Sequence, residues 1–359
     1  MIMNSSKVDL LSLSQEEALK LSDDDKRKRF KQVKVSHPMI AETLAEMATL
    51  ASPNSGKSIL LLTGPPGVGK STLVEVLHEM VLADHREEMV TDPSFIPIAS
   101  MVAPASGERG FSWRMFYSEI GRAIQEPLLN RKLETLQVND QKPVTIYSTK
   151  TSVSAMRMAV ESIIAQRRVR TIVIDEAVPI LRQARGNDLE NHMDALKTLA
   201  DKGATLVLVG SYDLHQLTKM SGQLARRMGV VHFRRYKPDV EDEVREFRKI
   251  VQQFQKYMPI KGLPDLGERA EDLQVACVGC VGNLKLVLTT ALEVTLRNKG
   301  KWSNECLDRA LFSQDQMLTI LEETLLGERL LETSALGSSS LKALVKASKE
   351  RLASLRPAG

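Results

Sequence analysis

The chain has 359 residues, of which 43% are hydrophobic and 26% charged, so it can bury a core in one large or two medium domains. Its net charge is +4, aromatic residues make up 4% and there are three cysteines, which argues against base stacking on exposed rings and against a disulfide framework. The apolar runs are strand-sized and the N-terminus is polar, so we expect a cytoplasmic protein without a membrane-spanning segment or signal peptide.

The N-terminal residues 1–34 are polar, and their stretch DDDKRKRFK sets a block of acids before a block of bases. We expect a solvated arm here, and the alternative is an arm that contacts DNA or a partner. Residues 38–50 then repeat apolar side chains at helical spacing, which predicts a helix that begins at Pro38.

A glycine-rich turn in residues 58–72, SILLLTGPPGVGKST, joins an apolar strand to a helix. The turn matches G-x-x-x-x-G-K-[ST] completely, and such loops bind phosphate because their N–H groups point inward at a helix N-terminus. We expect Lys70 to reach the β- and γ-phosphates of a nucleotide and Ser71 to bind Mg²⁺. The other loop residues expected at the nucleotide are Gly64, Pro65, Pro66, Gly67, Val68, Gly69 and Thr72.

The residues that lead into the helix before this loop are candidates to hold the base. In nucleotide-binding modules with a helix directly before the phosphate-loop strand, the segment that enters that helix often closes over the base. Val35, His37 and Pro38 occupy this place in the sequence. We therefore predict that these three residues contact the base.

The middle of the chain alternates strand and helix patterns. Residues 95–102 read as a second strand, and residues 111–125 repeat apolar positions at helical spacing. Residues 127–151 have weak periodicity and several turn formers, so we interpret them as an insertion. A helix over 152–167 follows.

The stretch TIVIDEA, residues 171–177, is the second motif that carries chemistry. Its continuous apolar run is typical of a buried parallel strand, and it ends in two carboxylates where open α/β sheets bind ligands. Asp175 would hold Mg²⁺ through its water shell, and Glu176 would polarise the attacking water. Acids at a strand end are common, but together with a complete phosphate loop they indicate a hydrolytic site.

A helix over 186–201 and a strand over 204–211 come next. Ser211, at the tip of this strand, is placed to touch the γ-phosphate or the lytic water. Arg226 and Arg227 then end a helix before a fifth strand. They form either a solvated face or an arginine finger that is offered to the nucleotide of a neighbouring subunit.

From Pro238 onward only helical patterns appear, which predicts a lid. Lys285 lies near the start of one lid helix, where it either leans onto the nucleotide or extends along the surface. The tail, residues 337–359, has five basic residues and one acid, and its leucines recur at helical spacing. Such a tail suits the DNA backbone, an acidic partner or a neighbouring subunit.

These motifs occur in the order found in AAA+ ATPases, and the chain resembles that class over about residues 35–300. Within the class it resembles the TniB/TnsC family of transposition regulators. The segments that carry this second resemblance are VSHPMIAETLAEM, IPIASMVAPASGERGFSWRMFYSEIGRAIQEP, DALKTLADKGATLVLVGSYDL and QLARRMGVVHF.

The resemblance implies a prokaryotic, ATP-dependent homo-oligomer, a ring or a helical filament, that assembles on duplex DNA. It also implies two protein partners, a target selector and a DDE transposase. Lys70 and Ser71 match the Walker A residues, and Asp175 and Glu176 match the Walker B acids. The remaining matches are Ser211 at sensor 1, Arg227 as the finger with Arg226 as its rival, and Lys285 near sensor 2, where arginine is commoner.

DNA contact needs few cations in each subunit, because an oligomer multiplies weak phosphate contacts. In the family the pore-lining elements follow strand 2, which nominates Arg109, Arg114 and Lys150. The alternative is that these are ordinary surface cations.

The sequence therefore predicts an α/β P-loop AAA+ module with a five-stranded parallel sheet flanked by helices, followed by a helical lid. We expect an arm over 1–34, the α/β subdomain over 35–237, the lid over 238–311 and a C-terminal appendage over 312–359. The predicted function is an Mg²⁺-dependent ATPase that regulates DNA transposition. The alternatives are a helicase-loader or clamp-loader-like remodeller, and a signalling switch that binds nucleotide without hydrolysing it.

Overall fold

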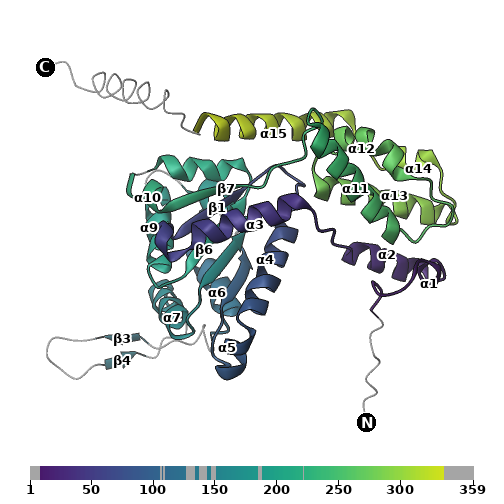
Figure 1. Cartoon of the computed structure of the whole chain (residues 1–359). Helices are drawn as coiled ribbons and strands as arrows, with labels where there is room; N and C mark the ends of the chain where they lie inside the picture. Colours follow the sequence, from purple (N-terminus) through teal and green to yellow (C-terminus); the bar gives the residue numbers. More distant parts are fainter. Residues whose placement is uncertain are drawn as a thin grey trace, which may run out of the picture.

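Five parallel strands form the central sheet of the computed structural model, in the order β2-β5-β6-β1-β7 (Figure 1). The structure describes residues 9–105, 107, 110–126, 134–136, 144–146, 151–184, 188–220 and 222–334. The five strands are β1 (Ile59–Thr63), β2 (Ile98–Val102), β5 (Thr171–Asp175), β6 (Thr205–Gly210) and β7 (Met228–His232). The predicted five-stranded parallel sheet is therefore confirmed.

Both faces of the sheet are buried, which explains why its central strands are apolar without alternation. In β1, Leu60 and Leu62 join one core cluster, whereas Ile59 and Leu61 join the other. The helices of this α/β part are α3 (Pro38–Ala51), α4 (Lys70–Asp84), α5 (Arg86–Thr91), α6 (Trp113–Ala123), α7 (Val153–Gln166), α8 (Val178–Arg182), α9 (Asp188–Ala200) and α10 (Gly222–Arg227), with the 3₁₀ helices η1 (Pro53–Ser55) and η3 (Tyr212–Lys219).

The strand order brings the candidate motifs to one edge of the sheet. In the register of β1 with β6, Thr63 pairs with Gly210, and β5 runs on the other side of β6. Because all three strands are parallel, the segments that follow Thr63, Asp175 and Gly210 leave the sheet at its C-terminal edge. The phosphate loop, the acidic pair and Ser211 therefore meet there.

The segment interpreted as an insertion contains two short antiparallel strands. These are β3 (Glu134–Leu136) and β4 (Val144–Ile146), and Thr135 pairs with Thr145. They form a two-stranded sheet separate from the central one. The residues around these strands, including the predicted DNA contact Lys150, lie outside the described residues.

The lid is helical, and it shares a core with the α3 and α4 face of the sheet. Its elements are α11 (Glu241–Tyr257), η4 (Leu266–Arg269), α12 (Ala270–Ala276), α13 (Val281–Arg297) and α14 (Asn304–Asp308). In the segment that joins the two parts, the Tyr236 N–H donates to the Gly279 carbonyl at 2.9 Å. This bond fastens the turn between α12 and α13 to the joining segment.

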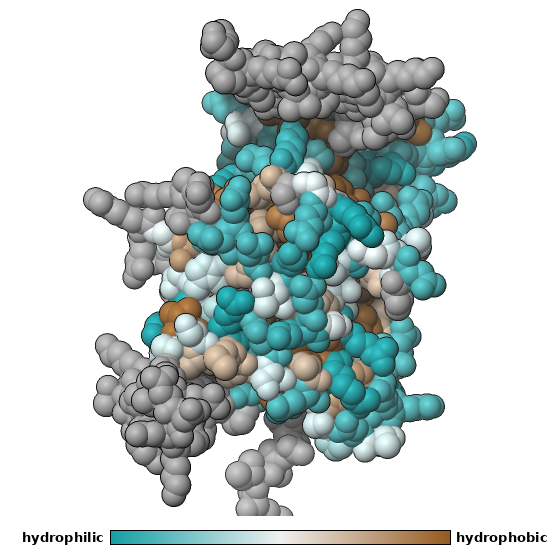
Figure 2. Space-filling model, turned by 90° about the vertical axis from the view of Figure 1, so that its left-hand side faces the viewer, coloured by the Kyte–Doolittle hydropathy of each residue, from teal (hydrophilic) through white to brown (hydrophobic). Residues whose placement is uncertain are grey.

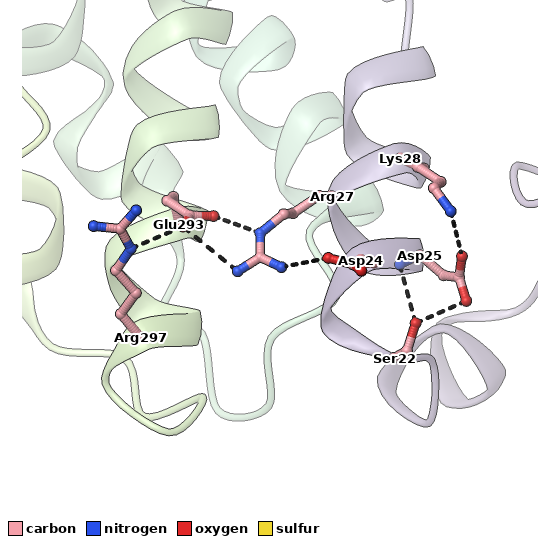
Figure 3. Close-up of polar contacts among 7 residues, drawn as sticks. All are labelled: Ser22, Asp24, Asp25, Arg27, Lys28, Glu293 and Arg297. Atoms are coloured by element: carbon pink, nitrogen blue, oxygen red, sulfur yellow. Dashed lines mark hydrogen bonds and ion pairs between the residues drawn. The ribbon is translucent and has the colours of Figure 1, made fainter.

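Residues 9–34 differ from the solvated arm expected from their composition. They form α1 (Gln15–Leu19) and α2 (Asp23–Gln32), which pack on the lid. Arg27 Nε donates to Glu293 of α13 at 2.6 Å (Figure 3), and Phe30 is buried with its ring centroid 6.3 Å from that of Phe254. Arg29 of α2 is buried as well, and its Nε and Nη2 donate to the carbonyls of Leu10 and Leu13 at 2.9 Å each. Phe30, Arg29 and the Arg27 ion pair thus anchor α2, while its other charged residues are exposed or partly exposed.

The last described helix, α15 (Gln314–Ser334), leaves the lid and runs back over the α/β part (Figure 1). It packs on η3, so this portion of the expected C-terminal appendage belongs to the body of the molecule. The face in Figure 2 is mostly hydrophilic, and its hydrophobic residues form small separate groups. Among the described helices none alone is long and apolar enough to cross a membrane, and Leu266–Ala276 with Val281–Arg297 pass that test only as a pair bent by 120°.

Candidate functional site

The phosphate loop adopts a curled conformation that its glycines permit. Gly67 has φ 74° and Gly69 has φ 112°, values that residues with a side chain rarely adopt. Lys70 begins α4, and its Nζ donates to the carbonyl oxygens of Gly64 at 2.8 Å and Pro65 at 2.9 Å. Burial lowers the pKa of the Lys70 ammonium, and charges that include Asp175 and Glu323 oppose this shift. The lysine therefore sits inside its own loop, where a phosphate would replace the two carbonyls.

The two predicted Mg²⁺ ligands lie together. Ser71 Oγ donates to Asp175 Oδ2 at 3.1 Å, across the gap between α4 and the end of β5. A hydroxyl and a carboxylate are oxygen donors of the kind that Mg²⁺ binds while it keeps several waters. These residues therefore fit the metal that the motifs imply.

Glu176 is held at the strand end by the backbone on both sides of it. Its own φ is 50°, its N–H donates to Asp175 Oδ1 at 2.8 Å, and the next N–H, of Ala177, donates to the Val209 carbonyl at 2.8 Å. A non-glycine residue at positive φ costs about 1 kcal/mol or more and persists where its surroundings impose it. The side chain is exposed beside Asp175, as an activator of water requires.

Ser211 lies where the sequence places it, after the end of β6. Its Oγ is buried and has no hydrogen-bond partner among the described residues. A buried hydroxyl without a partner is unfavourable, so this atom fits one that meets a phosphate oxygen or a water. The next residue, Tyr212, is fixed by a hydrogen bond of 2.9 Å between its hydroxyl and His232 Nε2 at the end of β7.

A small pocket beside the phosphate loop is lined by Val35 and His37, two of the three residues predicted to contact the base, and by residues of the loop and lid; Pro38 is not among its lining residues. His37 precedes α3, whose first residue is Pro38. The other lining residues are Val33, Lys34, Ile40, Val68, Gly69, Thr72, Phe254, Val281, Gly282 and Lys285. Its cavity of about 30 Å³ holds only one or two water molecules. The cavity is smaller than a nucleotide base, so a base at this place would require its lining residues to move apart.

In this structure the Lys285 ammonium is bonded to α2 rather than to the phosphate loop. Its Nζ donates to the Lys31 carbonyl at the end of α2, at 2.9 Å, and burial lowers the pKa of its ammonium. Lys285, the residue near the sensor 2 position, thus links the lid helix α13 to the N-terminal helix α2. A role at the γ-phosphate would need this bond to break.

Asn283 is a contact of the phosphate loop that the sequence reasoning missed. Its N–H donates to the Gly67 carbonyl at 2.9 Å, and its Nδ2 donates to the carbonyls of Pro66 at 3.4 Å and Cys277 at 3.2 Å. Gly282, the preceding residue, also lies against the phosphate loop, because an added Cβ there would lie 2.5 Å from the Gly67 carbonyl oxygen. The start of α13 therefore clamps the loop, and the signal in the sequence was the pair Gly282 and Asn283 before Lys285.

We expect Asn283→Asp to weaken nucleotide binding by roughly ten- to a hundredfold, because it removes the Nδ2 donor from a buried position and adds a negative charge beside the loop. The matched control is Asn298→Asp, at the exposed C-terminal end of the same helix. Titration with a fluorescent ATP analogue measures the affinity, and thermal unfolding measures stability. Equal affinities for the two variants would contradict the clamp.

His37 makes the stability of the folded chain depend on pH. Its Nδ1 is hydrogen-bonded to the Tyr236 hydroxyl at 3.1 Å, its ring stacks on Phe233 with centroids 6.2 Å apart, and burial lowers its pKa from 6.5 to about 4. Because the folded pKa is the lower one, the unfolded chain binds the proton more readily between these values. The stability from neutral His37 is complete above pH 6.5 and is lost as the pH falls toward 4.

We therefore expect the wild type to lose about 2 to 3 kcal/mol of unfolding free energy between pH 7 and about pH 4.5 that His37→Gln does not lose. Urea unfolding of both proteins at the two pH values measures this difference. A wild type and variant that weaken in parallel would show that His37 is not buried in neutral form.

Comparison with known proteins identifies the part of the chain that carries this site. Residues 53–218 match the family model described as "AAA domain". The chain contains an AAA domain. No curated protein sequence matches the chain.

The chain resembles two solved structures of ORC2 from Aeropyrum pernix, one in the ADP form and one in ADPNP–ADP complexes. Their TM-scores are 0.52 and 0.53 at 16% identity, over 79% and 80% of this chain and 71% and 72% of those chains. Cdc6p from Pyrobaculum aerophilum is similar with a TM-score of 0.48 at 14% identity, over 78% of this chain and 67% of that chain. The likeness to ORC2 supports the P-loop AAA+ fold predicted from the sequence.

Both candidate finger arginines lie at the opposite edge of the AAA domain from the phosphate loop. The Arg227 carbonyl accepts a hydrogen bond from Ser58 N–H at 3.0 Å, directly before β1, whereas the loop begins after β1. The five residues of β1 separate the two ends by roughly 16 Å. Neither arginine can therefore serve the nucleotide of its own chain.

The two arginines differ in what holds them. Arg227 Nη1 donates to Asp201 Oδ1 at 2.5 Å, and its side chain is 34% exposed. Arg226 is exposed, and in the described part of the chain its side chain has no hydrogen-bond or ion-pair partner. A partly exposed pair contributes at most about 1 kcal/mol, so the bond to Asp201 does not prevent Arg227 from turning to a neighbour.

Of the three predicted DNA contacts, only Arg114 lies within the described residues. It is exposed near the start of α6, and its Nη1 is 3.7 Å from Met156 Sδ of α7. Arg109 and Lys150 lie outside the described residues. Contact of these residues with DNA remains a prediction.

Proposed function

We propose that the AAA domain hydrolyses ATP. The observation that carries this proposal is the convergence of Lys70, the Ser71 and Asp175 pair, Glu176 and the partnerless Ser211 hydroxyl at one edge of the sheet. The ORC2 structures with a similar fold were determined with ADP and ADPNP, which is consistent with a nucleotide here.

Each residue has a distinct part in the reaction. Lys70 exchanges its two loop carbonyls for phosphate oxygens and neutralises their charge. Mg²⁺, held by Ser71 and Asp175 when bound, would polarise the phosphates and stabilise the charge that develops during transfer. Glu176 accepts a proton from the attacking water or orients it, and Ser211 fixes the γ-phosphate or that water.

We infer further that this ATPase is a cytoplasmic regulator of DNA transposition in a prokaryote. In this role the chain forms a ring or filament on duplex DNA and links a target selector to a DDE transposase. The support is the set of segments that resemble the TniB/TnsC family, together with two arginines that only a neighbouring subunit's nucleotide can use.

Nucleotide-dependent sedimentation with duplex DNA tests this function. We expect the chain to pellet with DNA in the presence of a non-hydrolysable ATP analogue and to remain in the supernatant without it. Lys70→Ala should stay in the supernatant in both cases. If the analogue and DNA together produce no assembly, the DNA-bound regulator is excluded.

A second candidate, a helicase-loader or clamp-loader-like remodeller, is favoured by the likeness of fold to ORC2. An adjacent gene for a DDE transposase would favour the transposition role, whereas a replication operon would favour the loader. A switch that binds nucleotide without turnover is the third candidate. It is separated from both by steady-state hydrolysis, in which the switch turns over no faster than its Glu176→Gln variant.

A further inference from the structure

Helix α15 crosses the AAA domain beside the phosphate site. At Gly327 it approaches Tyr212 so closely that an added Cβ would lie 2.0 Å from a ring carbon of the tyrosine. Tyr212 directly follows Ser211, the residue at the end of β6. Glycine inside a helix weakens it, so its presence in the middle of α15 is explained by this close approach.

A buried ion pair fixes the same stretch of α15. Arg235, three residues after β7, donates from Nε to Glu328 Oε1 at 3.0 Å and from Nη2 to Oε2 at 3.1 Å. Both side chains are only 10% exposed. Such a paired geometry is specific, and losing one partner leaves the other as an uncompensated charge. Gly327 and Glu328 thus form one contact with the domain, which we call the α15 latch.

Two acids of α15, Glu323 and Glu328, lie close enough to the domain for their charges to act on its groups. Burial raises the pKa of the Tyr212 hydroxyl, and the carboxylates of Glu328 and Glu323 raise it further. The charge of Glu323 also reaches Lys70. Because Arg235 neutralises Glu328, Glu323 is the acid of this stretch whose charge would oppose a bound triphosphate.

We propose that α15 covers the surface on which a second copy of this chain docks to complete the nucleotide site, and that the α15 latch must open before the copies assemble. The inference rests on the proposed ATPase, whose nucleotide site neither Arg226 nor Arg227 of the same chain can reach. The finger arginine of a second copy must arrive beside Ser211, where α15 now packs on Tyr212. The second copy would take the place of α15 on Tyr212 and Arg235.

The variant Gly327→Ala tests the latch directly. Alanine strengthens a helix, so α15 itself should stay folded, but the new methyl group cannot fit against the Tyr212 ring. If the latch is closed in about nine molecules of ten, opening it should lower the concentration at half-assembly by up to about tenfold. Sedimentation velocity with a non-hydrolysable ATP analogue measures assembly, and steady-state turnover should rise in parallel.

The matched control is Leu326→Ala, one residue away on α15. Leu326 is 62% exposed, so its truncation leaves the latch intact and should leave assembly and turnover as in the wild type. Amide hydrogen exchange of the wild type provides a test without any variant. Exchange of the α15 amides should become faster when the ATP analogue is added above the assembly concentration.

The outcomes separate this inference from the proposed function. If neither wild type nor Gly327→Ala binds a fluorescent nucleotide, the ATPase proposal itself fails. A second outcome is that both proteins bind the nucleotide equally while Gly327→Ala assembles only as well as the wild type or less well. In that case α15 is a fixed part of the domain and the inference fails. Unchanged α15 exchange on assembly would overturn it too, even if the variant did not fold.

Discussion

Replacing Glu176 with glutamine should lower the rate of ATP hydrolysis by roughly a hundredfold or more, because the amide cannot accept a proton from the attacking water. Binding should be kept, since Lys70, Ser71 and Asp175 are unchanged and glutamine has nearly the same shape. The bound nucleotide should therefore remain ATP in the variant. Single-turnover hydrolysis of radiolabelled ATP and titration of a fluorescent analogue measure the two quantities separately.

The control for this prediction is Glu190→Gln, which removes an exposed carboxylate from α9. It should hydrolyse ATP like the wild type, so a general effect of lost charge is excluded. A Glu176→Gln protein that turned over as fast as the wild type would remove Glu176 from the reaction. It would leave the water to be oriented by another group of the site.

Replacing Arg227 with alanine should reduce turnover by about a thousandfold if Arg227 is the finger, as the sequence pattern indicates. Its guanidinium would stabilise the phosphate charge of the neighbouring subunit, because roughly 16 Å of strand separates it from the site of its own chain. Mixing Arg227→Ala with Lys70→Ala should restore part of the activity. In the mixture, intact loops of the first variant can meet intact fingers of the second.

Arg226→Ala is the matched control, since the two arginines are adjacent on α10. We expect its turnover to stay within about tenfold of the wild type, as for an exposed cation outside the reaction. The reverse order of effects would make Arg226 the finger and leave Arg227 as the partner of Asp201. If neither variant loses activity and mixing restores none, both arginines only form a solvated face.

The parts of the site that could be predicted from the sequence are those encoded by backbone geometry over a few residues. The spacing of Gly64, Gly69 and Lys70 specifies a loop between a strand and a helix, and the apolar run before Asp175 specifies a buried parallel strand. Once both strands belong to one parallel sheet, their C-terminal ends share an edge. Proximity such as that of Ser71 to Asp175 follows from this.

Other contacts could not be predicted because they join residues far apart in the chain without a periodic pattern. Arg235 and Glu328 are 93 positions apart and each looks like a surface charge in the sequence. Phe30 is the only aromatic residue of α2 among many charged ones, and the Arg27–Glu293 pair joins residues far apart in the chain, so composition pointed to a solvated arm. Lys285 was placed by its motif, but the Lys31 carbonyl that it meets belongs to that same unexpected docking.

The most direct test of the account is ATP turnover by the wild-type chain as its concentration is raised, with and without duplex DNA. A site completed by a neighbouring copy predicts a rate per subunit that is low in dilute solution, rises with concentration, and rises at lower concentration when DNA gathers the subunits. The account would be contradicted by a rate per subunit that does not change with protein concentration or with added DNA. It would also be contradicted if no hydrolysis occurred at any concentration.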